Sequence, residues 1–92
     1  HRCADMKAPN SGNIYVNPDF LANNTPAIIG SAIGHELVHV DHYLRGLLDR
    51  SDIDSVNGSE RAAYHWQRAT AHLFGLGARF KEKMSAKIDE YQ

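Results

Sequence analysis

Two histidines and a glutamate near the middle of the chain have the types and spacing of a metal site. They are His35, Glu36 and His39, in the pattern His-Glu-x-x-His. On a helix, residues four apart lie on one face, so His35 and His39 can present both imidazoles to a single ion. Glu36 is turned by about 100° from His35, so it can accept a proton from a water that the ion acidifies. The pattern therefore predicts a zinc site with a base beside it, suited to hydrolysis.

The third ligand of such a site must come from another part of the chain, because a catalytic zinc usually has three protein ligands and keeps a fourth position for water. Glu60 is the best candidate, and residues 40–59 separate it from His39. Ser59 is a good N-cap residue, which places Glu60 in the first turn of a second helix after a polar loop at 49–59. The ordinary alternative for Glu60 is a carboxylate that complements the helix dipole.

Other side chains could supply this third ligand. Asp52 and Asp54 lie in the same polar loop. His42 lies on the ligand face, but one straight helix cannot easily place three of its own side chains around one ion, so we interpret His42 as part of a cleft wall or a residue behind the ligands. Cys3 is a minor option by comparison with peptide deformylase, whose Gly-Cys-Leu motif the surroundings of Cys3 do not match.

The helix that carries the motif has clear ends and two faces. Thr25 and Pro26 are typical of an N-cap and a first turn, and Gly46 is a plausible C-terminal stop. One face is apolar and consists of Ile29, Ile33, Leu37, Val40, Leu44 and Leu47. The histidines lie roughly 150° from the centre of that face, at 100° per residue. We therefore expect the helix to bury its apolar face in a core and to offer the histidines on the opposite side.

A second helix is expected at 59–74. Its core stripe consists of Ala62, Trp66, Ala69 and Leu73, and a different face carries Glu60, Tyr64, Gln67 and Ala71. Tyr64 lies one turn from Glu60, and we expect a half-buried tyrosine whose hydroxyl is satisfied locally; the alternative is a hydrogen bond to a tetrahedral intermediate or to a ligand carboxylate. His65 is turned well away from Glu60 on this helix.

The remaining segments complete an α+β fold. Residues 1–12 are expected to be irregular, 13–17 to form a short strand that ends at Pro18, and 20–24 to link the strand to the motif helix. Gly75 and Gly77 end the second helix, and a third follows at 78–91. The apolar stripe of the third helix is Phe80, Met84, Ile88 and Tyr91, and its basic side chains are interpreted as a solvated face.

Several of these segments resemble the compact gluzincin-like metallopeptidases. The matching stretches are 13–17, 35–42 and 60–64, with the continuations Gln67-Arg68-Ala69 and Leu73-Phe74-Gly75-Leu76. The resemblance implies a minimal zincin-like domain that cleaves peptide bonds, with His35, His39 and Glu60 as Zn²⁺ ligands and Glu36 as general base. It also implies an edge strand above the metal that pairs with the extended substrate.

More narrowly, the helix with Glu-x-x-Ala-Tyr and the following Phe-Gly-Leu resembles the metallopeptidase toxin domains of bacterial polymorphic (Rhs-type) toxins and secreted effectors. That resemblance implies a domain that is secreted or delivered into a target cell as part of a larger protein. Its partners would be a protein or peptide substrate and an immunity protein that covers the cleft. The alternative function is a non-catalytic, zinc-stabilised binding or assembly module.

Length and composition limit the remaining function classes. Ninety-two residues are expected to form one domain, and the abrupt start at His1 suggests a fragment or C-terminal piece of a larger protein. A net charge of −1 argues against a general nucleic-acid binder. No apolar run is long enough to cross a bilayer, so we expect no membrane partner. The core of so short a chain is thin, and a bound metal would therefore also stabilise the fold.

Overall fold

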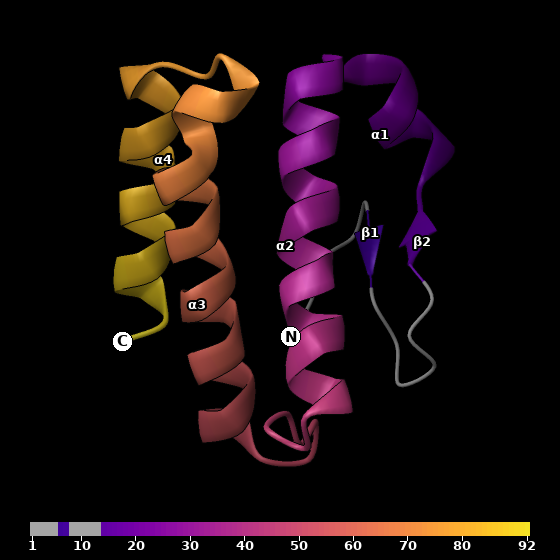
Figure 1. Cartoon of the computed structure of the whole chain (residues 1–92), viewed down its shortest axis with the longest axis vertical. Helices are drawn as coiled ribbons and strands as arrows, with labels where there is room; N and C mark the ends of the chain where they lie inside the picture. Colours follow the sequence, from indigo (N-terminus) through magenta and orange to yellow (C-terminus); the bar gives the residue numbers. More distant parts are fainter. Residues whose placement is uncertain (1–5, 8–13) are drawn as a thin grey trace.

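The computed structural model of the chain describes residues 6–7 and 14–92, which are mainly helical (Figure 1). The elements in order are β1 (Met6–Lys7), β2 (Tyr15–Val16), α1 (Pro18–Asn23), α2 (Pro26–Leu44), α3 (Ile53–Thr70), the short 3-10 helix η1 (Ala71–Phe74) and α4 (Ala78–Glu90). None of the described helices combines the length and the apolar character that crossing a bilayer requires.

The β-structure of the described residues is one short antiparallel pair, with Met6 opposite Val16 and Lys7 opposite Tyr15. The strand predicted at 13–17 is present as β2, whereas the prediction of irregular structure at 1–12 was wrong at the two residues of β1. A partner strand there satisfies backbone groups that a lone strand would leave unpaired. The predicted α+β class is only loosely compatible with a fold in which this pair is so small.

The segment expected to link the strand to the motif helix is itself partly helical. Asn17 caps α1, since its side-chain oxygen accepts a hydrogen bond from the backbone N–H of Asp19 at 2.8 Å, and Pro18 occupies the first helical position. Both features favour a helix start and were present in the sequence.

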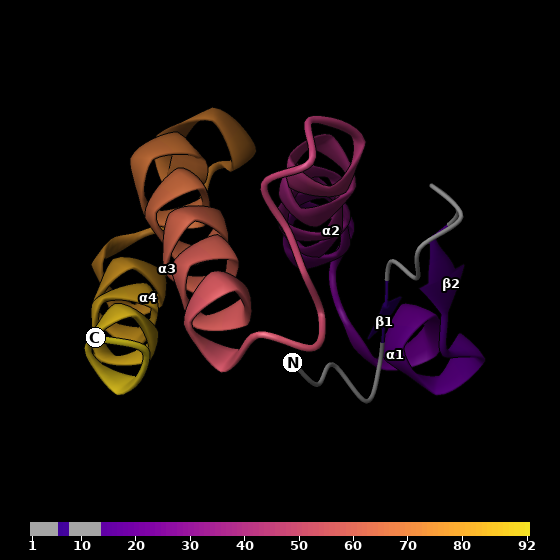
Figure 2. The same ribbon diagram turned by 90° about the horizontal axis from the view of Figure 1, so that it is seen from below.

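The helices α2 and α3 run antiparallel and side by side, and α4 returns beside α3 (Figure 1). The view from below places α3 between α2 and α4, with α1 and the strand pair on the other side of α2 (Figure 2). The interface between α2 and α3 therefore lies in the middle of the molecule, and it is the place where the candidate site is built.

The ends of α2 agree with the prediction. The Thr25 hydroxyl accepts a hydrogen bond from the backbone N–H of Ile28 at 3.3 Å, and Pro26 occupies the first turn. Gly46, with φ of 72°, follows the C-cap residue Arg45. A positive φ is readily adopted by glycine, which explains why the helix stops there.

The start of α3 was predicted wrongly. The helix begins at Ile53, and the carboxylate of Asp52 caps it by accepting a hydrogen bond from the backbone N–H of Asp54 at 3.1 Å. Val56 is buried and anchors these early turns in the core, so the polar segment folds as helix rather than loop. Ser59 is consequently a buried interior residue, and Glu60 lies about two turns inside α3 instead of in its first turn.

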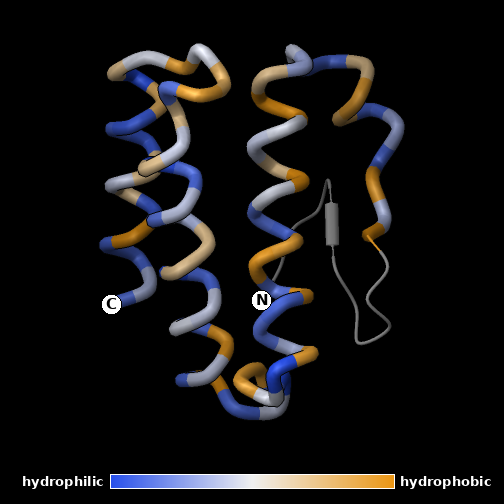
Figure 3. Tube along the Cα trace, in the orientation of Figure 1, coloured by the Kyte–Doolittle hydropathy of each residue, from blue (hydrophilic) through white to orange (hydrophobic). Residues whose placement is uncertain are grey.

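The prediction for the buried face of α2 was also wrong. In the apolar stripe that was expected to form the core, Leu37, Leu44 and Leu47 are exposed, Leu44 to 72%. Figure 3 shows apolar residues along α2, whereas α3 and α4 are mostly hydrophilic. The buried positions of α2 are Ser31, Gly34, His35, Glu36 and His39. The helix therefore buries its histidine face and leaves part of its apolar face in solvent.

A similar shift occurs on α3 and η1. Ala69 and Leu73 of the predicted stripe are exposed, and Trp66 is half-buried. The buried positions of α3 are Val56, Ser59, Glu60, Ala63 and Gln67. The stripe predicted for α4 is confirmed, since Met84 and Ile88 are buried and its remaining members are half-buried.

Glycines on α2 explain why its histidine side is the one that packs. A Cβ placed on Gly34 would overlap with the indole ring of Trp66, and one on Gly30 would lie 3.0 Å from Cε1 of Phe74. The two aromatic rings are themselves in edge contact, with centroids 6.1 Å apart. The glycines thus form a shallow groove that receives the aromatic side chains and lets α3 approach α2 closely.

Polar side chains form the centre of this interface. Among the described residues, the buried apolar side chains are Leu48, Val56, Ala63, Ala71, Met84 and Ile88. Seven buried side chains are polar, namely Ser31, His35, Glu36, His39, Ser59, Glu60 and Gln67. Buried polar groups destabilise a fold unless they are paired, so a thin core with this composition requires specific partners for them.

Candidate metal centre

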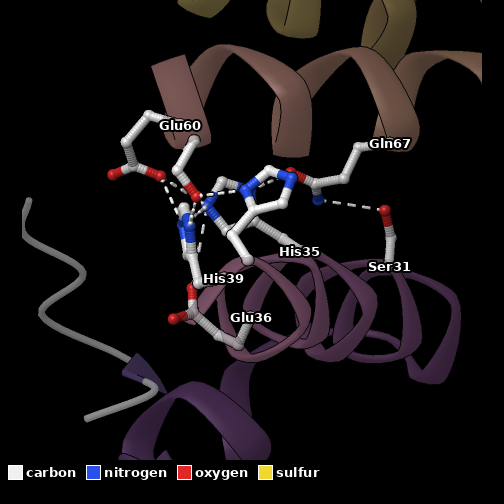
Figure 4. Close-up of polar contacts among 8 residues, drawn as sticks. Ser31, His35, Glu36, His39, Glu60 and Gln67 are labelled. Atoms are coloured by element: carbon white, nitrogen blue, oxygen red, sulfur yellow. Dashed lines mark hydrogen bonds and ion pairs between the residues drawn. The ribbon is translucent and has the colours of Figure 1, made fainter. Parts of the chain in front are cut away.

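Three donor atoms from α2 and α3 converge at one point (Figure 4). Nε2 of His35 and Nε2 of His39 lie 2.8 and 2.7 Å from Oε1 of Glu60, and 3.1 Å from each other. The two histidines come from successive turns of α2, and the glutamate reaches them from the facing turn of α3. The structure therefore brings together the three residues that the sequence indicated as ligands.

The spacing of these donors suits a small metal ion. Ligand bonds of about 2.0–2.1 Å in a tetrahedral zinc site place the ligand atoms about 3.3 Å apart. The donors of His35, His39 and Glu60 lie 2.7–3.1 Å apart, so a displacement of a few tenths of an ångström would admit the ion. All three side chains are buried, and together they could hold a metal ion.

Gln67 fixes the orientation of the first imidazole. Its side-chain oxygen accepts a hydrogen bond from Nδ1 of His35 at 2.8 Å, and its Nε2 donates to Oγ of Ser31 at 3.0 Å. Because the amide nitrogen is directed to Ser31, the amide oxygen faces the ring and the proton of a neutral imidazole lies on Nδ1. Nε2 of His35 then carries a lone pair that is directed into the site, as in metal-binding histidines.

Ser59 has the same relation to the second imidazole. Its hydroxyl lies 2.7 Å from Nδ1 of His39 and 2.7 Å from Nδ1 of His42. A hydroxyl has one proton to donate, so Ser59 can accept from His39 and donate to His42. This arrangement leaves the lone pair of His39 on Nε2. His42 lies behind the ligands and outside the donor group, in agreement with its interpretation from the sequence.

Electrostatics favour a cation among the donors. In this tautomeric arrangement, two imidazole lone pairs and a carboxylate oxygen face one another at 2.7–3.1 Å. Such atoms repel one another unless a proton or a cation lies between them. His39 and Glu60 are each 1% exposed, so water contributes little screening. A divalent cation would remove this repulsion and offset the desolvation of the carboxylate.

Glu36 lies beside the donors rather than among them. Its side chain is 1% exposed, and its Oε2 is 3.7 Å from Nε2 of His35. This places a second carboxylate at the edge of the site, one residue along α2 from a ligand, as the sequence pattern predicted (Figure 4). A carboxylate at this distance can reach a water or substrate group that is held at the three donors.

A cavity of about 370 Å³ opens onto the site. Its wall includes His35, Glu36 and Glu60. The other lining residues come from the four α-helices and the C-cap of α1, namely Phe20, Asn24, Ile28, Ala32, Tyr64, Gln67, Phe80, Lys83, Met84 and Lys87. Both glutamates of the site therefore face a space that is large enough for part of a peptide. Of the predicted edge strand, the described residues 14–17 are not among those that line this cavity.

Two tyrosines close one side of the site. The ring of Tyr64 contacts the imidazole of His35 edge-on, with centroids 4.5 Å apart, and Tyr91 stacks on Tyr64 with centroids 5.8 Å apart. Burial raises the pKa of Tyr91, and the negative charges of Glu60 and Glu90 raise it further. The half-buried state predicted for Tyr64 is confirmed, and its ring packs against the imidazole of His35.

The other candidate ligands lie elsewhere. Asp52 and Asp54 are exposed at the start of α3, and Asp52 is about 12 Å along the helix from Glu60 at 1.5 Å per residue. His65 is exposed and its Nδ1 lies 3.1 Å from Arg68 Nη2. Cys3 lies outside the described residues.

The sequence did not reveal the residues that hold the imidazoles. The helical pattern puts Gln67 on the face of Glu60 without indicating a function for it, and it favours Ser59 as a helix cap. Ser31 stands one turn before His35 on α2, where no sequence pattern singles it out. Each of these three residues is a serine or glutamine within two turns of a candidate ligand. Such residues are common in helices, so their spacing alone could not identify them.

Comparisons of the chain with protein-family models, with curated protein sequences and with solved structures find no match. The function of this chain must therefore be inferred from the geometry of its site.

Proposed function

We propose that this chain is a zinc-dependent metallopeptidase domain in which His35, His39 and Glu60 bind the metal and Glu36 is the general base. The observation that supports it most strongly is the convergence of three buried donor atoms within 3.1 Å of one another. Two imidazoles and one carboxylate are the ligand set of the His₂Glu zinc peptidases. The resemblance of the motif to gluzincin-like enzymes, and a minimal zincin-like arrangement of α2 and α3, are part of the same proposal.

The chemistry follows from the positions of the protein groups. When bound, zinc would acidify a water molecule and polarise the carbonyl of the scissile bond. Glu36 would accept the proton of the attacking water and then donate it to the leaving amine. Gln67 and Ser59 would hold the two imidazoles in the tautomer that binds metal. Burial of these groups would exclude bulk water and strengthen their interactions with the substrate.

A purely structural zinc site is the competing hypothesis, and it would use a fourth protein ligand. Among the described residues, the donor group consists of His35, His39 and Glu60, while His42 is bound to Ser59. The cavity that reaches Glu36 and Glu60 further favours an enzyme, because a structural site has no need of access. Cleavage of a peptide pool by the zinc-loaded protein, and its loss in Glu36→Gln, is the experiment that tests the enzymatic function.

The narrower proposal is that this domain acts as a bacterial toxin or effector, delivered into a target cell as part of a larger protein. Its support is the resemblance of the sequence around Glu60 to metallopeptidase toxin domains. Expression in a bacterial cytosol should then inhibit growth for the wild type but not for Glu36→Gln, and a cognate immunity protein should restore growth. Equal growth of both strains at equal protein levels would contradict a toxin that acts in that compartment.

A further inference from the structure

A second depression lies beside the cavity at the candidate metal centre, along α4. The second depression has a volume of about 650 Å³ and is lined by Ile28, Leu76, Gly77, Arg79, Phe80, Glu82 and Lys83. It shares Ile28, Phe80 and Lys83 with the first cavity. The two depressions are therefore neighbours. Together, here called the groove, they are lined from His35 and Glu36 to the loop between η1 and α4.

Basic side chains follow this groove along α4. Arg79, Lys83 and Lys87 are spaced four residues apart, so they form a stripe on one side of the helix. Lys83 and Lys87 line the cavity at the metal centre, and Arg79 and Lys83 line the second depression. This basic stripe lies beside the apolar stripe that includes Phe80 and Met84. These basic residues were expected to form a solvated face, but they also border the groove.

The acidic groups near the stripe compensate it only in part. Oε2 of Glu90 lies 3.3 Å from Nζ of Lys87, and Glu82 lines the far part of the groove. The other acids on the wall, Glu36 and Glu60, lie at the metal centre, where a bound dication would offset their charge. The part of the wall contributed by α4 thus has an excess of positive charge beside an apolar floor.

We propose that this groove selects peptides in which an apolar residue near the scissile bond is accompanied, within a few residues, by a carboxylate that Lys83 and its neighbours on the stripe bind. This inference rests on the proposed peptidase function. From Arg79 to Lys87 the stripe extends about 12 Å along the helix axis, which matches three to four residues of extended peptide. The apolar floor that includes Ile28, Phe80 and Met84 receives the apolar side chain, and the carboxylate is either an acidic side chain or the C-terminus.

The test compares matched peptides on matched variants. The peptides are fluorescently labelled hexapeptides with one central leucine, made with glutamate or glutamine near it and with a free or amidated C-terminus. The proteins are zinc-loaded wild type, Lys83→Glu and, as control, Lys81→Glu. Lys81 is an exposed residue of α4 that lines neither depression. Lys81→Glu changes the net charge of the protein by the same amount as Lys83→Glu. Binding is measured by anisotropy on the Glu36→Gln background, and cleavage on the active background.

The inference predicts that wild type and Lys81→Glu prefer the carboxylate peptides by about three- to tenfold, the range of one partly exposed charge-assisted contact. Lys83→Glu should abolish or reverse the preference while retaining its zinc. A preference for glutamate identifies the side chain as the source of the carboxylate, and a preference for the free terminus identifies the C-terminus. Equal binding of all peptides by wild type, or equal effects of the two reversals, would overturn the inference.

The two proposals fail in different ways. If zinc-loaded wild type binds carboxylate peptides selectively but cleaves no peptide, the peptidase function is contradicted and the selectivity of the groove is supported. Cleavage without regard to carboxylates, with the same rates in wild type and Lys83→Glu, would leave the peptidase and contradict the groove's selectivity.

Discussion

The indole ring of Trp66 occupies the space where a side chain on Gly34 would otherwise lie. Gly34 immediately precedes the proposed ligand His35 on α2, and Trp66 immediately precedes Gln67 on α3, whose amide holds the His35 ring. This contact therefore sets the distance between the two helices at the metal centre. The close approach of the backbones is what lets the short Glu60 side chain reach both imidazoles.

Replacing Gly34 should separate the helices. In Gly34→Ala the new methyl group overlaps with Trp66, and we expect destabilisation of about 1–3 kcal/mol, the usual cost of overpacking. Gly58→Ala is the matched control, because a Cβ at this position of α3 meets no atom within 4 Å and alanine favours a helix by up to about 1 kcal/mol. Urea unfolding of both variants measures the difference. Equal stability of Gly34→Ala and wild type would contradict the close packing, and the double variant Gly34→Ala/Trp66→Leu should recover part of the loss.

Zinc should stabilise the fold markedly, because its donors occupy the centre of a thin core. At a hundredfold excess of free zinc over Kd, the free energy of unfolding should rise by about 2.7 kcal/mol. For a domain of this size, that corresponds to an increase in Tm of about 10–20 °C. Differential scanning calorimetry with and without zinc measures the shift. Magnesium serves as the control ion, because it prefers oxygen ligands to imidazole, and an equal shift with magnesium would argue against this site.

The hydrogen bond that Nδ1 of His39 donates to Ser59 should matter for metal affinity. Ser59→Ala removes the acceptor that holds the ring, and we expect zinc affinity to fall about 10–100-fold. His42→Ala leaves that bond intact and should have a much smaller effect. Competition with a chromophoric chelator gives both affinities. If zinc affinity falls more in His42→Ala than in Ser59→Ala, His42 is itself a ligand and the position assigned to it behind the ligands is wrong.

Some features of this structure could be predicted from the sequence because they depend on local chemistry. Thr25 and Pro26 start α2 and Gly46 ends it through capping and backbone preferences that need no tertiary partner. Spacing of four residues places His35 and His39 on one helix face regardless of the fold. The stripe that includes Met84 and Ile88 likewise follows from helical periodicity. Glu60 was identified by requiring a third donor, which is a rule of zinc chemistry rather than of folding.

Other features depend on tertiary packing and could not be obtained from the pattern. A run that includes Leu37 and Leu44 is typical of a buried face, yet the glycine groove and the polar site select the opposite side of α2. The residues before Ser59 are polar, and both Asp52 and Ser59 are suitable N-cap residues. Local chemistry therefore does not decide that α3 starts after Asp52. Hydrophobic periodicity predicted the wrong buried face of α2, because the centre of this molecule is a network of polar side chains that includes the buried Glu60.

Removal of the general base should stop catalysis without loss of the metal. Glu36→Gln keeps the size of the side chain but cannot accept a proton, so we expect peptide cleavage to fall by a factor of about 10²–10⁴ or more, with zinc content unchanged. Asp41→Asn, at an exposed position of the same helix, is the control and should retain the wild-type rate. Mass spectrometry of a peptide pool records the cleavage. Undiminished cleavage by Glu36→Gln would exclude this residue as the base.

Zinc content by elemental analysis shows whether His35, His39 and Glu60 together bind one zinc ion. The measurement compares purified, folded wild type, Glu60→Gln and the control Asp52→Asn after exposure to zinc and gel filtration. We expect about one zinc per chain in wild type and in Asp52→Asn, and a marked loss in Glu60→Gln. No zinc in the folded wild type, or equal zinc in wild type and Glu60→Gln, would exclude a zinc site made by these three residues.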